Sequence, residues 1–80
     1  MPTSQDKVLQ FHINRLKDRS RDVVLRTIEE LIKFGASAES ALPALEQLFR
    51  TTEDPVIKKA AQVAGLEIHK KVKEAKQQEA

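Results

Sequence analysis

Apolar residues recur three or four positions apart along almost the whole of this chain. Residues at that spacing lie on one face of an α-helix, so each run of them predicts a helix with one buried stripe. Counting in this way predicts an all-α fold of four helices, at about 5–17, 21–34, 40–50 and 55–72.

Residues typical of helix ends separate these segments. Asp54-Pro55 is the clearest helix start, because Asp54 can accept from free amides and proline suits the first helical position. Ser20 is a second predicted N-cap, and Gly35 can take the left-handed conformation that ends a helix. Ser37 and Ser40 are candidate caps in the connection that follows Gly35. Pro43 is tolerable only in the first turn of the third helix.

The expected core consists of the apolar stripes of the four helices. The second helix is apolar over about 200° of its circumference, which is too wide for one neighbour, so we expect it to be central. The stripe of the fourth helix is rich in alanine, which allows another helix to approach closely. The stripes contain Leu9, Ile13 and Leu16; Val23, Val24, Leu25, Ile28, Leu31, Ile32 and Phe34; Leu42, Leu45, Leu48 and Phe49; and Ile57, Ala60, Ala61, Ala64, Ile68 and Val72.

The length and composition of the chain limit its functions. With 80 residues we expect one domain over 1–80, with a tail at 74–80 that frays and little core to spare for a deep pocket. Cysteine is absent, which excludes disulfides and fits a reducing cytoplasm. No segment approaches the roughly 18 apolar residues that span a membrane, and the start MPTSQDK lacks the apolar core of a signal peptide. We therefore expect no membrane insertion.

Residues suited to catalysis or ligand chemistry are sparse. His12 and His69 fall on different predicted helices, and neither has a metal-ligand companion four positions away. Gly35 and Gly65 are the only glycines, and neither belongs to a glycine-rich phosphate loop. We expect no enzymatic activity, no cofactor and no metal.

A weak internal repeat links the two halves of the chain. A shift of 34 residues superimposes 20–34 on 54–68, which pairs Val23 with Ile57, Thr27 with Ala61, and Phe34 with Ile68. Repeats of about 30 to 47 residues made of helix pairs are typical of helical solenoids.

Two segments carry a resemblance to a known repeat family. The run Asp54-Pro-Val-Ile-Lys-Lys-Ala-Ala61 is similar to the opening of a first helix in HEAT repeats, including the HEAT-like repeats of phycobilisome-lyase families. Phe34-Gly35 followed by Ala41-Leu-Pro-Ala-Leu45 is similar to the helix end and the proline-bearing second helix of the same repeat. The resemblance covers about 9–72. Ser20-Arg21 stands where the repeat has Asp-Pro, and Gly65 stands where it has leucine.

The resemblance implies a short α-solenoid of helix pairs. It concerns the scaffold and brings no catalytic residue with it, so it implies pigment-lyase activity only remotely. The alternative that the same helices and short connections allow is an up-and-down four-helix bundle.

The charge distribution points to a macromolecular partner. The net charge is +2, but residues 15–26 are basic, 27–54 are acidic and 55–80 are basic again. Such asymmetry favours electrostatic steering. The function we expect is a non-enzymatic protein-binding module, such as an adaptor, scaffold or assembly factor. The alternative is a nucleic-acid-binding module that uses the basic turn at 15–26. The cations of that turn that would contact nucleic acid are Arg15, Lys17, Arg19 and Arg21. The chain has no Tyr or Trp to stack on bases.

The fourth helix carries the candidate protein-binding surface. Leu66 lies among cations over about 120° opposite the alanine stripe, an arrangement that suits an acidic amphipathic partner. The cationic residues are Lys58, Lys59, His69, Lys70 and Lys73. The competing interpretation is a solvated charged face with one incidental leucine.

Two other surfaces are weaker candidates. The edge of the third helix with Glu46, Gln47 and Arg50 is the next candidate for binding a protein. Val8 and Phe11 lie off the apolar stripe of the first helix, so we also expect a homo-oligomer at high concentration.

Overall fold

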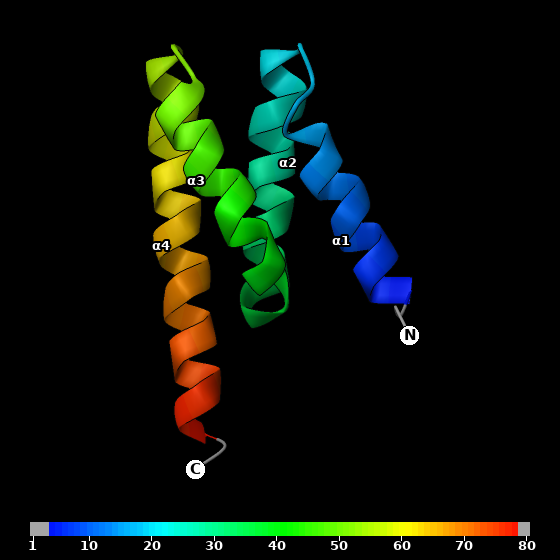
Figure 1. The fold of residues 1–80 in the computed structure, drawn as a ribbon, viewed down its shortest axis with the longest axis vertical. Helices are drawn as coiled ribbons and strands as arrows, with labels where there is room; N and C mark the ends of the chain where they lie inside the picture. The colour runs from blue at the N-terminus through cyan, green and yellow to red at the C-terminus, as the bar shows by residue number, and fades with distance from the viewer. Residues whose placement is uncertain (1–3, 79–80) are drawn as a thin grey trace.

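The structure is a computed structural model that describes residues 4–78, and side chains from residue 7 to residue 77. The described chain folds as α1 (Ser4–Arg15), α2 (Arg21–Phe34), the 3₁₀ helix η1 (Gly35–Ala41), α3 (Leu42–Thr51) and α4 (Pro55–Gln78) (Figure 1). Every element is helical, which confirms the all-α class.

Two helix ends differ from the sequence prediction. The helix α1 ends at Arg15 instead of Lys17, because the next amides bond three residues back, from Leu16 to the Ile13 carbonyl and from Lys17 to the Asn14 carbonyl, both at 3.2 Å. Bonds of that kind tighten a last turn into 3₁₀ geometry. At the other end of the chain, α4 remains helical to Gln78, through most of the segment 74–80 that we expected to fray. Residues 79–80 lie outside the described range.

The connection between α2 and α3 is a 3₁₀ segment with a kink at Ala38. Gly35 has a φ of 59° and ends α2 as predicted, with its amide donating to the Ile32 carbonyl. The chain then forms η1, in which Ala38 and Ala41 are completely buried. Burial of these small side chains holds the segment against the core.

The predicted caps in this connection were wrong. The N-cap positions of η1 and α3 are Phe34 and Ala41, and neither makes a side-chain cap hydrogen bond. Ser37 and Ser40 are exposed instead. Because η1 continues directly into α3, the first amides of α3 follow helical backbone and do not depend on a serine. Pro43 lies in the first turn of α3, as predicted.

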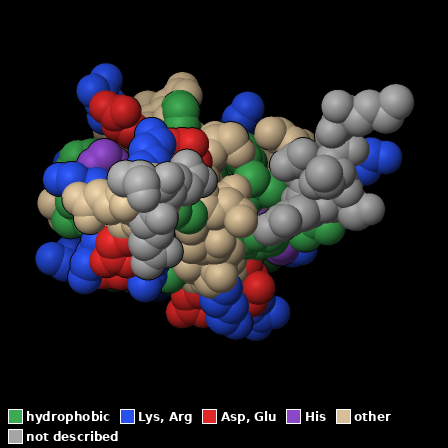
Figure 2. All heavy atoms as spheres, turned by 90° about the horizontal axis from the view of Figure 1, so that it is seen from below, with side chains coloured by type: hydrophobic (Ala, Val, Ile, Leu, Met, Phe, Trp, Pro, Cys, Tyr) green, Lys and Arg blue, Asp and Glu red, His purple; other side chains and the backbone are tan. Residues whose placement is uncertain are grey.

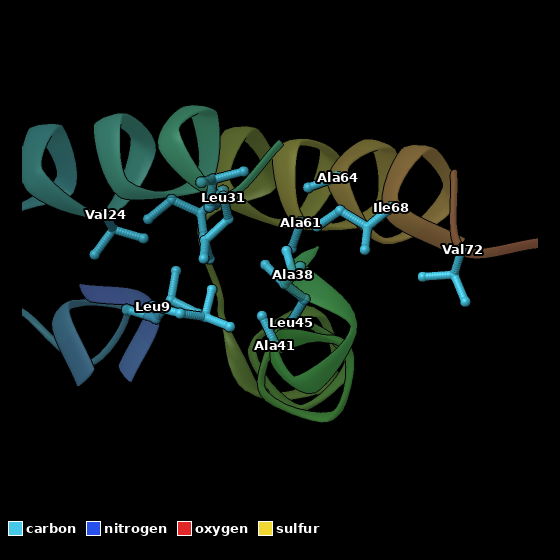
Figure 3. Close-up of a cluster of buried hydrophobic side chains, with 13 residues drawn as sticks. Leu9, Val24, Leu31, Ala38, Ala41, Leu45, Ala61, Ala64, Ile68 and Val72 are labelled. Carbon is cyan, nitrogen blue, oxygen red and sulfur yellow. The ribbon is translucent and has the colours of Figure 1, made fainter. Parts of the chain in front are cut away.

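One apolar core joins all five elements (Figure 3). It contains most of the predicted stripes of α1, α2 and α4, with Val23 outside it, while Leu45 is the only fully buried residue of α3 among those described. Its members are Leu9, Leu16, Val24, Ile28, Leu31, Ala38, Ala41, Leu45, Ile57, Ala61, Ala64, Ile68 and Val72. The sequence prediction missed Thr27, a buried polar residue whose hydroxyl donates to the Val23 carbonyl at 2.7 Å. That bond satisfies the hydroxyl without a partner outside α2.

The helices pack in a definite order. Chain direction in Figure 1 shows α2 and α4 running the same way and α1 and α3 running the opposite way. Within the described residues, α4 packs against α3, η1 and α2, whereas α1 packs against α2 and η1. The parallel helices α2 and α4 are therefore direct neighbours, and α1 lies on the far side of α2 from α4.

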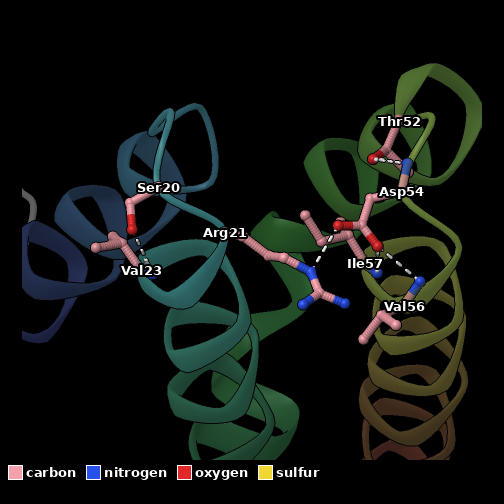
Figure 4. A network of polar contacts seen from close by, with 7 residues as sticks. All are labelled: Ser20, Arg21, Val23, Thr52, Asp54, Val56 and Ile57. Carbon is pink, nitrogen blue, oxygen red and sulfur yellow. Dashed lines mark hydrogen bonds and ion pairs between the residues drawn. The ribbon is translucent and has the colours of Figure 1, made fainter.

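A polar network connects the beginnings of α2 and α4 (Figure 4). The Ser20 hydroxyl accepts from the Val23 amide at 3.5 Å, and Asp54 Oδ1 accepts from the amides of Val56 and Ile57 at 2.8 and 3.3 Å. Arg21 Nε donates to Asp54 Oδ2 at 2.7 Å. Both predicted N-caps are confirmed. The Arg21–Asp54 ion pair connects the two parallel helices at their N-terminal ends.

The carboxyl of Asp54 has a pKa below its ordinary value of 3.8. Partial desolvation raises the pKa, but the amide hydrogen bonds from Val56 and Ile57, together with the hydrogen bond and charge of Arg21, outweigh it. Because the folded pKa is lowered, the ionised carboxylate stabilises the fold fully above pH 3.8. This contribution is lost as the pH falls through the folded pKa.

We expect the charge and the cap of Asp54 to be separable by substitution. At neutral pH Asp54→Ala should lower the Tm more than Asp54→Asn, because asparagine can still accept from the two amides. As the pH falls below 3.8, the Tm difference between the unmodified chain and Asp54→Asn should shrink. Thermal unfolding followed by circular dichroism checks both expectations. A Tm difference independent of pH would contradict the charge contribution.

Candidate functional site

The predicted binding residues lie on the exposed side of α4. Leu66 is 65% exposed, the most exposed of the large apolar side chains described. The cations predicted to surround it are all exposed on the same helix: Lys58, Lys59, His69, Lys70 and Lys73. The opposite side of α4 is buried through Ala61 and Ala64. The structure thus brings together the surface that the sequence predicted.

An apolar groove runs between this surface and α3. It has a volume of about 430 Å³ and combines α3 side chains with one side of α4. Its lining residues are Leu42, Leu45, Glu46, Phe49, Ala61, Gln62, Gly65, Leu66 and His69. Leu66 and His69 are the two predicted residues that line it. The groove itself was not predicted, because it exists only where two helices meet.

The remaining cations take two different positions around the groove. Lys58 Nζ lies 5.1 Å from the centre of the Phe49 ring, at the end of the groove near the beginning of α4. Lys59, Lys70 and Lys73 lie further around the exposed side of α4, and none forms an ion pair with a described residue. Only part of the predicted cluster therefore contacts α3.

The α3 edge of the groove contributes little net charge. Glu46 Oε1 accepts from Arg50 Nη2 at 2.6 Å, one turn along the same helix. These are two of the three residues proposed as a second protein-binding edge. Because the carboxylate and the guanidinium neutralise each other, the cations beside the groove are the exposed lysines of α4.

Two exposed valines were missed by the sequence analysis. Val56 and Val63 are 47% and 41% exposed on α4. They do not line the groove with α3. Their spacing of seven residues places them on one face, which was the available signal for them. The signal was weak because Lys59 and Lys70 lie between and after these valines along the helix.

The cations proposed to bind nucleic acid differ in their contacts. Arg21 forms the ion pair with Asp54, and the Arg15 guanidinium lies 5.3 Å from the Phe11 ring centre. Lys17 lines a hollow between α1 and α3, whereas Arg15 lines a different one between α1 and α2. Arg19 is exposed in the turn.

Charges of both signs also alternate at the end of the molecule where α4 finishes. Figure 2 shows basic and acidic side chains interspersed there, with apolar patches between them. A surface that attracts a polyanion needs cations concentrated on one face, and this end does not show such a face.

The two histidines lie on different helices of the described chain. His12 packs edge-on against Phe11 and Phe34, with ring centres 5.8 and 5.7 Å apart, while His69 is on α4. Among the described residues there is no group of three or more His, Asp or Glu side chains that could hold a metal ion. None of the described helices is both long enough and apolar enough to cross a membrane.

Comparison with known protein families, curated proteins and solved structures gives no match for this chain.

Proposed function

We propose that this chain is a non-enzymatic protein-binding module, an adaptor, scaffold or assembly factor of the HEAT-like type, that works in the cytoplasm. The observation that carries the proposal is the exposed groove between α3 and α4, with Leu66 at its edge and cations along α4. An apolar anchor with polar residues around it is the usual composition of a protein-binding surface. The cysteine-free sequence is compatible with a reducing compartment.

The packing order supports a short solenoid over a closed bundle. In an up-and-down bundle of four helices, the first and last helices are neighbours and close the core. Here α4 packs against the parallel helix α2, and α1 lies on the other side of α2. Stacked helix pairs have this order, because each first helix contacts the first helix of the next pair.

The internal repeat agrees with the same interpretation. Ser20 and Asp54, which the shift of 34 residues superimposes, are the N-caps of α2 and α4. Thr27 and Ala61, paired by the same shift, are both buried. We therefore propose that α2 and α4 are the first helices of two successive repeats, and that the groove between α3 and α4 lies where these two repeats meet.

Affinity capture from cells that make the protein tests this function against nucleic-acid binding. We expect proteins that remain bound after nuclease treatment. Partners that disappear with nuclease would instead favour nucleic acid, and direct binding of mixed-sequence duplex DNA at physiological salt would confirm that outcome.

We also propose weak self-association through α1. Val8 and Phe11 are 47% and 56% exposed, and the chain has no polar repeat to cover them within the described residues. Light scattering at millimolar concentration should give a mass above that of the monomer. The double substitution of Val8 and Phe11 by serine should restore the monomer mass. A strictly monomeric unmodified chain would contradict this proposal.

A further inference from the structure

The groove between α3 and α4 is long enough for about two turns of a helix. Its α4 wall extends from Ala61 to His69, which is about 12 Å at the helical rise per residue, or roughly two turns. Leu42, Phe49 and Leu66 supply apolar walls, and the groove is open to solvent along its length. An amphipathic helix can lay its apolar face into such a groove.

Gly65 is the residue that the rest of the chain does not explain. Glycine is unfavourable inside a helix compared with alanine, and of the two glycines only Gly35 has a positive φ. A Cβ atom added at Gly65 would meet nothing within 4 Å. No turn and no close contact within the chain therefore requires glycine here. A glycine facing an open groove does permit another backbone to approach closely.

The charged side chains beside the groove favour a partner of opposite charge. Lys58 lies over the Phe49 ring at one end of the groove, and Lys59, Lys70 and Lys73 lie along the exposed side of the same helix. The carboxylate of Glu46 is paired with Arg50. A partner helix with acidic residues beside its apolar face would complement this field, whereas a basic one would be repelled.

A second copy of the chain is a poorer occupant. Its exposed apolar helix is α1, whose sequence carries Lys7 and Arg15 against the single acidic residue Asp6. That helix would bring a net positive charge beside the exposed lysines of α4.

We propose that the α3/α4 groove binds an acidic amphipathic helix of a partner protein, with the partner backbone closest to α4 at Gly65. This inference rests on the proposed protein-binding function and adds the partner's chemistry and its position. It predicts that adding a side chain at Gly65 blocks binding while leaving the fold intact.

The probe for this test is a stapled synthetic helix with leucine at positions i, i+3, i+4 and i+7 and glutamate elsewhere. The control peptide has the same leucines with lysine in place of glutamate. Titration into isotope-labelled protein, followed by amide chemical shifts, maps the bound surface, and fluorescence anisotropy gives the Kd. We expect the acidic peptide to bind more tightly than the basic one and to shift the amides of α3 and α4 that line the groove.

Three variants locate the contact. Gly65→Gln should weaken binding at least about tenfold, while its Tm stays equal or rises because a helical glycine is removed. Leu66→Ala should weaken it about 5- to 30-fold. Val63→Ala is the matched control for Leu66→Ala, because Val63 is an exposed apolar residue of α4 outside the groove, and it should leave the Kd unchanged.

The contribution of the lysines is tested by measuring the rate at which the acidic peptide associates. Replacing Lys59, Lys70 and Lys73 by glutamine should chiefly slow association and flatten its salt dependence, because exposed charges steer approach more than they hold the complex. An unchanged association rate would remove these lysines from the site.

Several results would overturn the inference. They are equal binding of the acidic and basic peptides, shifts outside the groove, unchanged affinity of Gly65→Gln, and absence of binding. Concentration-dependent shifts of the groove amides without peptide would assign the groove to a second copy. In each case the proposed protein-binding function still stands if the proteins captured from cells remain bound after nuclease treatment. Failure of the groove inference can therefore be distinguished from failure of the proposed function.

Discussion

Leu31→Ala is expected to lower the free energy of unfolding by about 2 to 5 kcal/mol. Leu31 has no exposed surface, and it lies on α2 in the core that joins all five elements (Figure 3). A domain of this size is stable by only about 5 to 10 kcal/mol, so the loss is a large share of the total. The Tm should fall by roughly 10 °C or more.

Lys33→Ala is the matched control for this loss. Lys33 lies two residues further along α2 with its side chain exposed, and its ion pair with Glu30 has an N···O distance of 3.3 Å. An exposed pair of this kind contributes little. Thermal and urea unfolding of both variants gives the comparison. If Leu31→Ala unfolded no earlier than Lys33→Ala, the buried face of α2 would be wrongly assigned.

Ala64→Leu is expected to destabilise the fold by about 1 to 3 kcal/mol through overpacking. Ala64 has no exposed surface and lies on the side of α4 that faces the core (Figure 3). Helices approach closely where alanine lines the contact. The larger side chain must therefore displace α4 from its neighbours or leave a favourable rotamer.

The adjacent position provides the control for this prediction. Gly65→Leu adds a larger side chain one residue further on, where a new Cβ meets nothing within 4 Å. It also removes a helical glycine, so we expect an unchanged or higher Tm. Urea unfolding of the two leucine variants should thus show opposite effects. Equal losses of stability in the two variants would contradict the structure, in which Ala64 faces the core and the position of Gly65 is open.

The structure exposes the predicted residues of α4 together and places part of α3 beside them. The helical period placed Leu66 among the cations of one helix, and the structure has them exposed together. The contribution of Leu42 and Phe49 required knowing that α3 packs beside that face. The same limitation applies to Arg21, which was counted with the basic turn. Its pairing with Asp54, 33 residues away, follows from the packing of α2 beside α4.

The sequence by itself determined the features that depend on neighbouring residues. The span Arg21–Phe34, the caps Ser20 and Asp54 and the ending at Gly35 follow from local hydrogen bonding and backbone preference. The tertiary structure decided three features: residues 35–41 form a 3₁₀ helix, the serines in it do not cap a helix, and α2 packs against α4. The physical reason is that helical periodicity specifies which face of a helix is buried and carries no information on what covers it. That choice depends on how all the buried faces fill one core together.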